Sequence, residues 1–252
     1  MVEEHLGKMK IVAVIPARSG SKSIKNKNIV KLGKHPLVAY SIAICKLSKL
    51  VDETVVSTDS MRIAYISKKY KANVPFLRPK KISRDNSSDY DFFTHYINYL
   101  KEKNKKIPDL LLHIRPTTPL RDLKIFNKGI KYFLKNKNFT SMRSVHQSNI
   151  TPFKVFKNNN KSLVGFFPKI KKKEYYNLPR QKYPETLIPN GYIDIIKPEI
   201  MKNKTLHGKK ILSFETGRIT DIDTKQDLDF AKNEIKKTVY KKLTKYLDKL
   251  KN

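Results

Sequence analysis

A cluster of small polar and basic residues follows the first apolar segment of the chain, at Arg18-Ser19-Gly20-Ser21-Lys22 and again at Lys27-Asn28. A glycine beside hydroxyl residues leaves backbone N–H groups free to point at phosphate oxygens, and cationic side chains add positive charge. The stretch lacks the GxxxxGK[ST] frame of a Walker A loop. Its composition indicates either a phosphate-binding loop or a solvated basic turn, and spacing alone leaves both interpretations open.

Two aspartates, Asp221 and Asp223, form the second group that could do chemistry. We expect residues 218–223 to form a strand, in which residues i and i+2 project to the same face. Two carboxylates placed in this way can converge on a hard cation such as Mg²⁺. The alternative is a solvated pair, with Asp223 acting only as a cap for the helix that begins near Thr224.

Composition narrows the classes of function. The single cysteine, Cys45, lies in an apolar helical pattern, which indicates packing and excludes an internal disulfide or a multi-cysteine zinc site. Lys and Arg together number 54 against 22 Asp and Glu, for a formal net charge of +32. Only nine of these cations are Arg, and the Lys residues are spread along the chain. A dedicated nucleic-acid-binding protein is therefore the alternative from another class and not the main expectation.

The sequence predicts no contact with a membrane. No apolar run approaches the roughly 20 residues needed to cross a bilayer. The first five residues, MVEEH, lack the basic flank and apolar stretch of a signal peptide. We expect a cytoplasmic protein.

Strands and helices must position these groups, and the first half of the chain alternates between them. The apolar run 10–17 reads as a strand buried on both faces, and a helix is expected from Pro36. Further strands are expected at 53–58, 72–77 and 109–114, and further helices at 61–70, from a Ser88 cap onward, and at 122–134. This alternation implies a parallel sheet covered on both faces, whose ligands bind beyond the carboxyl ends of the strands. The loops that start at Arg18, Thr58 and Arg115 are the candidate binding loops.

The pattern changes near residue 140. Short strands are expected at 140–145, 153–156 and 162–167, before a long irregular stretch at 168–190. Such a stretch is usually functional or part of an interface. Strands return at 191–196, 209–215 and 218–223, and residues 232–252 form a Lys-rich amphipathic pattern, expected to be one solvated helix.

Read in order, several segments resemble the acylneuraminate cytidylyltransferases, which are the CMP-sialic acid synthetases and their CMP-nonulosonate relatives. Those enzymes begin with an IPARxGSKxIPxKNI-like segment, similar to IPARSGSKSIKNKNI at 15–29. The other matching segments are VVSTDS at 55–60, VPFLRP at 74–79, RPTTPLR at 115–121, LPRQKYP at 178–184, Pro189-Asn190-Gly191 and Asp221-Ile222-Asp223-Thr224. The ordered series covers roughly residues 10–230 and is far more specific than any one segment.

The resemblance implies a three-layer α/β fold, nucleotidyltransferase-like (Rossmann-like), with a mostly parallel sheet and a small dimerisation insertion. It divides the chain into a nucleotide-binding core at 9–145, the insertion at 146–188, a second part of the core with the Asp pair at 189–231, and a C-terminal helix at 232–252. It also implies a homodimer whose active sites are shared between subunits.

The reaction implied by the resemblance joins CTP to an acidic α-keto sugar such as sialic acid or another nonulosonate. The anomeric hydroxyl attacks the α-phosphorus, pyrophosphate leaves, and a CMP-sugar forms. This chemistry needs positive charge on the triphosphate, a divalent metal and a site for an anionic sugar. The alternatives are a CMP-Kdo-type or other sugar nucleotidyltransferase, an inactive binding-only relative, and the nucleic-acid-binding protein.

Motif positions carry the implied roles onto this sequence. The residues implied to bind CTP are Arg18, Ser21, Lys22, Lys27, Asn28, Arg78, Ser83 and Asp85. Those implied to be catalytic are Arg18, Lys22, Lys27 and Asp221, and Mg²⁺ is implied to bind Asp221 and Asp223. The residues implied to bind the sugar are Arg115, Thr117, Thr118, Arg121, Lys154, Arg180, Gln181 and Asn190.

This chain departs from the family pattern at several positions. Arg115 stands where the family has Gln, and Tyr192 and Asp194 introduce a bulky residue and a carboxylate into the NGA(I/F)Y segment. Ser23 and Lys25 replace the usual Gly and Pro of the basic loop. We therefore expect the triphosphate-binding residues to be retained and the sugar pocket to be remodelled, which leaves the acceptor open.

Overall fold

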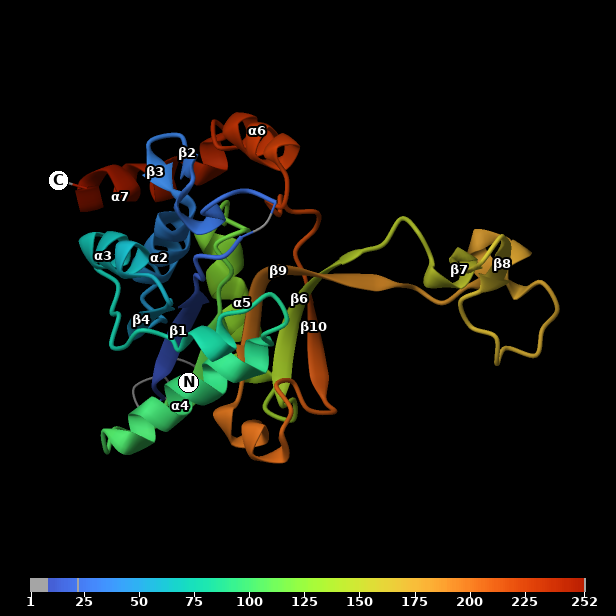
Figure 1. Ribbon diagram of the computed structural model, residues 1–252, viewed down its shortest axis with the longest axis horizontal. Helices are drawn as coiled ribbons and strands as arrows, with labels where there is room; N and C mark the ends of the chain where they lie inside the picture. The colour runs from blue at the N-terminus through green and yellow to red at the C-terminus, as the bar shows by residue number, and fades with distance from the viewer. Residues whose placement is uncertain (1–8, 22, 252) are drawn as a thin grey trace.

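A six-stranded sheet forms the centre of the protein in the computed structural model, which describes residues 9–21 and 23–251 (Figure 1). The strand order is β10-β6-β9-β5-β1-β4. The strands are β1 (Ile11–Pro16), β4 (Glu53–Ser57), β5 (Leu110–His113), β6 (Ser141–Gln147), β9 (Leu187–Ile196) and β10 (Ile211–Glu215). Only β9 runs antiparallel to its neighbours. The expected mostly parallel α/β fold is confirmed.

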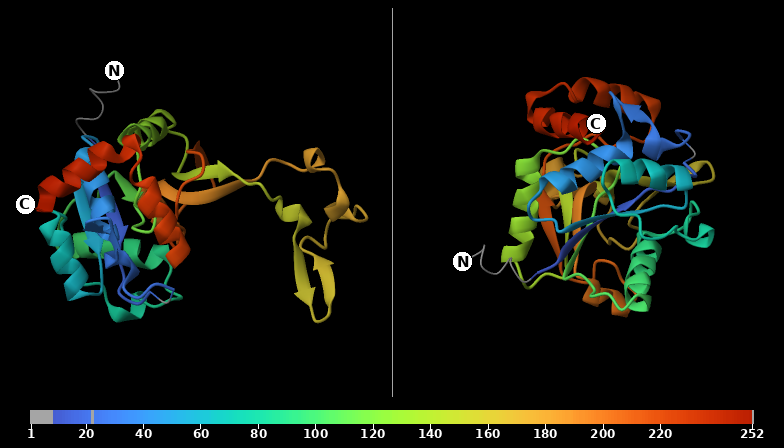
Figure 2. Two further views of the ribbon diagram at one scale, coloured as in Figure 1. Left: turned by 90° about the horizontal axis from the view of Figure 1, so that it is seen from above. Right: turned by 90° about the vertical axis from the view of Figure 1, so that its left-hand side faces the viewer.

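Helices cover both faces of the sheet and complete three layers (Figure 2). They are α2 (Leu37–Leu47), α3 (Met61–Lys69), α4 (Asp89–Glu102), α5 (Leu123–Lys135), α6 (Lys225–Glu234) and α7 (Lys241–Lys251). Alternate residues of β1 enter opposite layers: Ile11 and Ile15 pack with α2 and α5, whereas Val12 and Val14 pack with α4. Because both faces of β1 are buried, its sequence is continuously apolar and not alternating.

Several predicted elements differ in the structure. Residues 72–77 make two isolated bridges, at Asn73 and Leu77, where a short strand was expected. The segment 153–156 begins instead with a 3₁₀ turn, η3 (Pro152–Lys154). Residues 216–223 follow an irregular path, so the predicted final strand is wrong. The Ser88 cap is confirmed, since its N–H donates to Asp91 Oδ2 at 2.7 Å.

An arm formed by residues 148–186 projects from the body (Figure 1). The paired ends of β6 and β9 form its stem, and the hairpin of β7 (Phe156–Asn159) and β8 (Ser162–Gly165) lies within it. Tyr175 and Tyr183 organise the irregular stretch: the Tyr183 hydroxyl donates to the Tyr175 carbonyl at 2.7 Å, and the Phe167 N–H donates to the Tyr175 hydroxyl at 2.6 Å. The stretch predicted to be functional or part of an interface is therefore an ordered element.

The C-terminal segment is not the single solvated helix that its sequence pattern predicts. Helix α6 ends at Glu234, and α7 begins at Lys241 after a 3₁₀ turn, η7 (Thr238–Tyr240). Leu243 and Leu247 are buried, and α7 packs against α2. The Lys side chains of the pattern between residues 232 and 249 are exposed, while Leu243 and Leu247 extend the core. Among the described residues, no helix combines the length and apolar character that spanning a membrane requires.

Candidate active site

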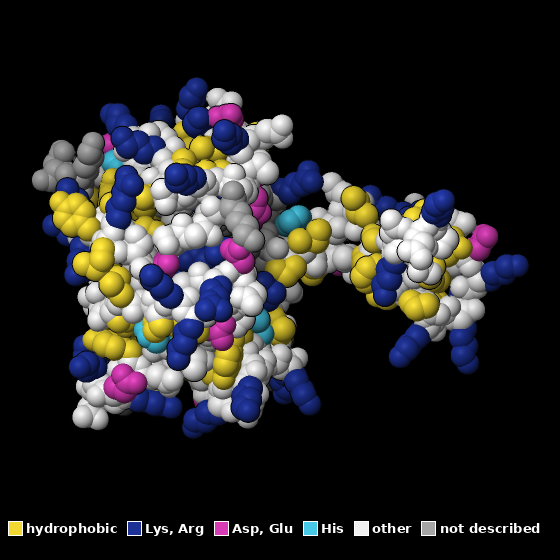
Figure 3. Space-filling view, viewed as in Figure 1, with side chains coloured by type: hydrophobic (Ala, Val, Ile, Leu, Met, Phe, Trp, Pro, Cys, Tyr) yellow, Lys and Arg dark blue, Asp and Glu magenta, His cyan; other side chains and the backbone are white. Residues whose placement is uncertain are grey.

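A cleft of about 430 Å³ opens at the carboxyl ends of β1 and β5, where parallel strands present their loops. Basic and acidic side chains lie close together across this face of the body (Figure 3). Eight of the residues predicted for the site line the cleft: Arg18, Ser21, Lys27, Asn28, Arg78, Asp85, Arg115 and Thr117. The fold thus brings together residues that are up to about 100 positions apart in sequence. Lys22, also predicted, lies outside the described residues.

The basic loop after β1 is held in a defined conformation. Asp59, which follows β4, accepts hydrogen bonds from the Ser19 N–H and from the Ser19 hydroxyl, both at 2.8 Å. Asn28 is buried and its Nδ2 donates to the Arg18 carbonyl at 2.8 Å, which closes the loop on itself. Arg18 forms an ion pair with Asp85 at 2.6 Å. A solvated turn needs none of these contacts, and they favour the interpretation as a binding loop.

Arg78 presents a buried guanidinium to the cleft. The residue is 6% exposed, and its Nε and Nη2 atoms have no hydrogen-bond partner among the residues that the structure describes. Its Cζ lies 5.8 Å from the centroid of the Phe92 ring. Burial lowers the pKa of Arg78. Because buried N–H groups of a cation are costly to leave without acceptors, this side chain is suited to an anionic ligand.

The acidic pair lies beside the same cleft. Asp223 Oδ1 accepts from Lys27 Nζ at 2.7 Å, and Lys27 lines the cleft. Between the two aspartates, Ile222 is buried, and its N–H donates at 2.7 Å to the carbonyl of Thr117. Asp221 and Asp223 are both exposed on either side of the buried Ile222, in an irregular segment. The predicted strand is absent, and the convergence of the two carboxylates on one cation stays a prediction. Thr224, and not Asp223, caps α6.

The donor set of the acidic pair fits Mg²⁺. Magnesium is usually held by one or two carboxylates together with waters and substrate phosphates, so two aspartates are enough for the protein's share of its ligands. Within residues 9–21 and 23–251, no cluster of three or more His, Cys, Asp or Glu could enclose a metal by itself. The remaining ligands of such an ion would have to come from the nucleotide and from water.

At the far end of the cleft, Arg115 is clamped by two carboxylates. Its Nη1 donates to Asp194 Oδ2 at 2.8 Å, and its Nη2 donates to Asp89 Oδ2 at 3.1 Å. Burial alone would lower the pKa of Arg115, but the two carboxylates outweigh that effect and raise it. Two of the departures noted in the sequence, Arg115 and Asp194, thus contact each other. Compared with the family pattern, this chain has therefore added an Arg115–Asp194 ion pair and not a single unpaired charge.

Three residues expected to bind the sugar instead hold the core together. Arg121 is wholly buried, and burial lowers its pKa to about 10. Its guanidinium donates to carbonyls and a hydroxyl around it, namely those of Tyr192, Thr118, Arg115, Gly191 and Ser41. Thr118 is also wholly buried, and Asn190 is tied to Thr216 Oγ1 at 2.7 Å. None of the three lines the cleft, so their contact with the sugar stays a prediction that the described chain does not support.

Other predicted residues lie outside this cleft. The Ser83 hydroxyl donates to the carbonyl of Pro79 at 3.0 Å and only supports the neighbouring turn. Lys154, Arg180 and Gln181 belong to the projecting arm (Figure 1). Within one chain the arm does not bring them to the cleft.

Sequence reasoning missed four residues that shape the cleft: Asp59, Asp89, His113 and Asp194. Asp59 stands in VVSTDS, whose loop was singled out without a role for the carboxylate. Asp194 is a charge within an otherwise apolar strand, which was the available signal. His113 lies wholly buried against Phe92 and Phe93, and this burial holds its pKa well below the ordinary histidine value.

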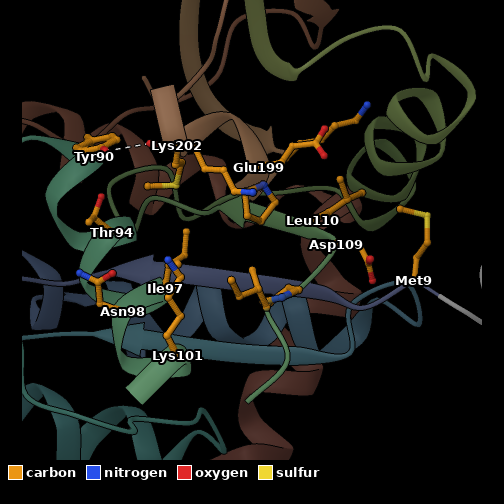
Figure 4. Close-up of a pocket in the computed structure, with 15 residues that line it drawn as sticks. Met9, Tyr90, Thr94, Ile97, Asn98, Lys101, Asp109, Leu110, Glu199 and Lys202 are labelled. Atoms are coloured by element: carbon orange, nitrogen blue, oxygen red, sulfur yellow. Dashed lines mark hydrogen bonds between the residues drawn. The ribbon is translucent and has the colours of Figure 1, made fainter. Parts of the chain in front are cut away.

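A second cavity, of about 660 Å³, lies at the opposite end of the sheet, near the starts of β1 and β5 (Figure 4). Met9, Ile97 and Leu110 contribute apolar surface, and Lys101 and Lys202 lie at its side. The Tyr90 hydroxyl donates there to the carbonyl of Met201 at 3.1 Å. None of the residues predicted for the active site lines this cavity.

The mostly parallel sheet, the ordered basic loop and the acidic pair across the cleft together define a nucleotidyltransferase class of enzyme. A model described as cytidylyltransferase matches residues 12–242, and the chain belongs to that family. The family inferred from the motifs and the class of enzyme are both confirmed.

Named relatives support the same grouping. The chain is 28% identical over 226 residues to an N-acylneuraminate cytidylyltransferase of Escherichia coli, covering 88% of this chain but only 50% of that protein. It is 29% identical over 231 residues to a pseudaminic acid cytidylyltransferase of Campylobacter jejuni, covering 89% and 95% of the two chains. The solved structure of a CMP:2-keto-3-deoxy-manno-octonic acid synthetase with CTP superposes with a TM-score of 0.65 at 16% identity, covering 90% and 98%, which shows a shared fold.

Proposed function

We propose that this protein transfers CMP from CTP to the anomeric hydroxyl of an acidic α-keto sugar of the sialic acid or nonulosonate type, releasing pyrophosphate. The observation that carries the proposal is the contact of Lys27 with Asp223 at the side of a cleft that also holds Arg18 and Arg78. Cations for a triphosphate and carboxylates for its metal meet there. Relatives named for N-acylneuraminate and pseudaminic acid support the sugar class.

The cleft residues have distinct roles in this reaction. Arg78, whose Nε and Nη2 lack protein partners within the described chain, binds the nucleotide, and Arg18 and Lys27 bind the phosphates. The acceptor oxygen forms a bond to the α-phosphorus while the bond from that phosphorus to the bridging oxygen breaks, and pyrophosphate departs with the electron pair. The two cations stabilise the charge that grows on the leaving group. Asp221, the other carboxylate of the acidic pair, is the residue that we propose accepts the hydroxyl proton.

Asp221 and Asp223 would hold Mg²⁺ against the triphosphate. When bound, the ion supplies Lewis-acid stabilisation of phosphoryl charge and helps to align the leaving group. Dependence on a nucleoside triphosphate is consistent with the cytoplasmic location expected from the sequence.

The arm supports a homodimer with shared sites. It exposes apolar side chains that one chain leaves uncovered, among them Ile150 and Leu163, at 71% and 70% exposure. Pairing two arms would bury such groups and would carry Lys154, Arg180 and Gln181 toward the cleft of the neighbouring subunit. In this arrangement the sugar-binding cations of each site come from both chains.

Pyrophosphate release tests the proposal directly. The four nucleoside triphosphates are each incubated with a panel of nonulosonic acids and Kdo, with and without Mg²⁺. We expect release with CTP, an acidic keto sugar and Mg²⁺ together. Release with Kdo alone would move the acceptor to the Kdo class. No release from any combination, together with salt-sensitive binding of DNA of any sequence, would contradict the proposal and favour a nucleic-acid-binding protein.

A further inference from the structure

Asp194 is a buried carboxylate within an otherwise apolar part of β9. It lies on β9 between His113 of β5 and Arg143 of β6, in register with both, and it is wholly buried. The neighbouring residues of the strand, Ile193 and Ile195, are apolar. Burying a carboxylate in a sheet is costly unless it is paired, so its presence calls for a specific role.

One oxygen of Asp194, Oδ2, faces the basic side chains around it. Oδ2 lies 2.8 Å from Arg115 Nη1, 3.7 Å from Arg143 Nε and 4.0 Å from His113 Nδ1. Oδ1 is buried and has no hydrogen-bond partner among the described residues. Because burial keeps the pKa of His113 low, this imidazole is neutral near pH 7 and adds no charge. The single short contact, to Arg115, is therefore the main compensation for the buried carboxylate.

Arg115 links this buried anchor to the open cleft. Its side chain is 22% exposed and lines the cleft, and its second terminal nitrogen meets Asp89, whose side chain is 44% exposed. Gly191 leaves room for the Arg115 side chain to run from Asp194 to the cleft, because a Cβ at residue 191 would lie only 3.1 Å from Arg115 Cδ. The guanidinium is thus held rigidly at its inner end and has an oxygen anion at its outer end. That outer contact shows that a carboxylate oxygen can sit on Nη2 at 3.1 Å.

We propose that Asp194 is a positioning residue that aims the Arg115 guanidinium at the carboxylate of the acceptor sugar, and that this pair sets acceptor selectivity. The inference rests on the proposed function and extends it to residues by which this chain departs from its family pattern. Asp194 fixes the orientation of Nη1. The acceptor carboxylate then takes the place on Nη2 that the half-exposed Asp89 occupies in the free protein. A freely rotating cation would bind the same group with less selectivity.

The test compares Asp194→Asn with the unaltered protein by steady-state pyrophosphate release, varying CTP and the acceptor separately. We expect the KM for the acceptor to rise about tenfold or more while the KM for CTP changes less than twofold. The same assay with the methyl ester of the acceptor removes the carboxylate. With the ester, the variant and the unaltered protein should have the same kcat/KM within twofold.

A second variant separates positioning from loss of structure. Asp194→Asn alone leaves Arg115 short of a partner and is expected to lower the melting temperature. Arg115→Gln/Asp194→Asn removes both charges, so its melting temperature should return toward that of the unaltered protein while its acceptor KM stays as high as that of Arg115→Gln alone. An acceptor KM within twofold of the original in Asp194→Asn, or an equal loss on acid and ester, would overturn the inference. If the unaltered protein releases no pyrophosphate with any acceptor, it is the proposed function that fails.

Discussion

Lys27 and Asp223 are 196 residues apart in the sequence, and their side chains form a 2.7 Å hydrogen-bonded ion pair. Lys27 belongs to the turn that ends the basic loop, and Asp223 precedes the N-cap of α6. The contact joins the segment expected to bind phosphates to the segment expected to bind metal. Lys27 and a divalent cation would both use the Asp223 carboxylate. When the triphosphate draws Lys27 away, Asp223 becomes free for the metal, so we expect nucleotide and metal to bind together.

Replacing either aspartate of the pair should abolish catalysis and leave the fold intact. We expect Asp221→Asn and Asp223→Asn each to lower kcat for pyrophosphate release by about 100-fold or more, because the metal and its charge stabilisation are lost. Both side chains lie at the surface, so unfolding free energies should stay within about 0.5 kcal/mol. Asp229→Asn, an exposed aspartate of α6 that pairs only locally with Lys232, is the matched control and should retain activity. Full activity in Asp221→Asn would contradict the metal assignment.

Arg78 is expected to lower the stability of the fold while contributing to the binding of CTP. In Arg78→Met the buried, incompletely paired charge is replaced by an apolar chain of similar length, so the free energy of unfolding should rise by about 1 kcal/mol. The KM for CTP should increase about tenfold or more. Thermal unfolding and pyrophosphate-release kinetics measure the two effects. A less stable protein that still binds CTP normally would show that Arg78 is a structural cation.

Arg121 is expected to matter for stability and not through contact with substrate. Arg121→Lys keeps the charge but loses the planar fork, which leaves several buried carbonyls without donors, and should cost about 3 kcal/mol or more. Denaturant unfolding would report the change. Arg62→Lys, an exposed change on α3, serves as the control and should alter stability by less than about 0.5 kcal/mol. A small effect in Arg121→Lys would return this residue to the list of candidate sugar ligands.

Stability should fall on acidification partly because of His113. Its folded pKa is depressed by burial, so the unfolded chain binds the proton first as the pH drops below about 6.5. The stabilising contribution is complete above that pH and is lost as pH falls toward the folded pKa, by at most about 1.4 kcal/mol per pH unit for one proton. His95 and His207 shift in the same direction. Denaturant titrations between pH 7.5 and 5 should therefore show a shallower decline in His113→Asn than in the unaltered protein, and parallel curves would refute this assignment.

The exposed arm should control assembly. Leu163→Glu places a charge on an apolar side chain of the β7–β8 hairpin and should shift the protein from dimer to monomer in light scattering at micromolar concentration. Because the hairpin lies apart from the core, the melting temperature of the body should change little. Activity should fall in parallel with the dimer if Arg180 and Lys154 serve the neighbouring cleft. A monomer in the unaltered protein would rule out this role for the arm.

The secondary structure of the chain could largely be predicted from its sequence. Apolar runs such as residues 11–16 and helical periodicity such as that of 37–47 depend on burial against neighbouring layers, so they predicted elements, layers and the edge at which ligands bind. The ordered motifs indicated the family. Residues with an obvious charge at a loop, such as Arg18 and Lys27, were assigned to the cleft that they line.

Tertiary contacts decided which polar residues face a ligand and which serve the fold. Arg115 and Arg121 stand in one loop and are chemically identical, yet one lines the cleft and the other is enclosed by backbone carbonyls. That difference arises from the packing of β9 and α2 around the loop, which local spacing does not encode. The pairing of Arg115 with Asp194 and the break between α6 and α7 likewise depend on residues distant in the chain, because charge compensation and burial are properties of the assembled structure.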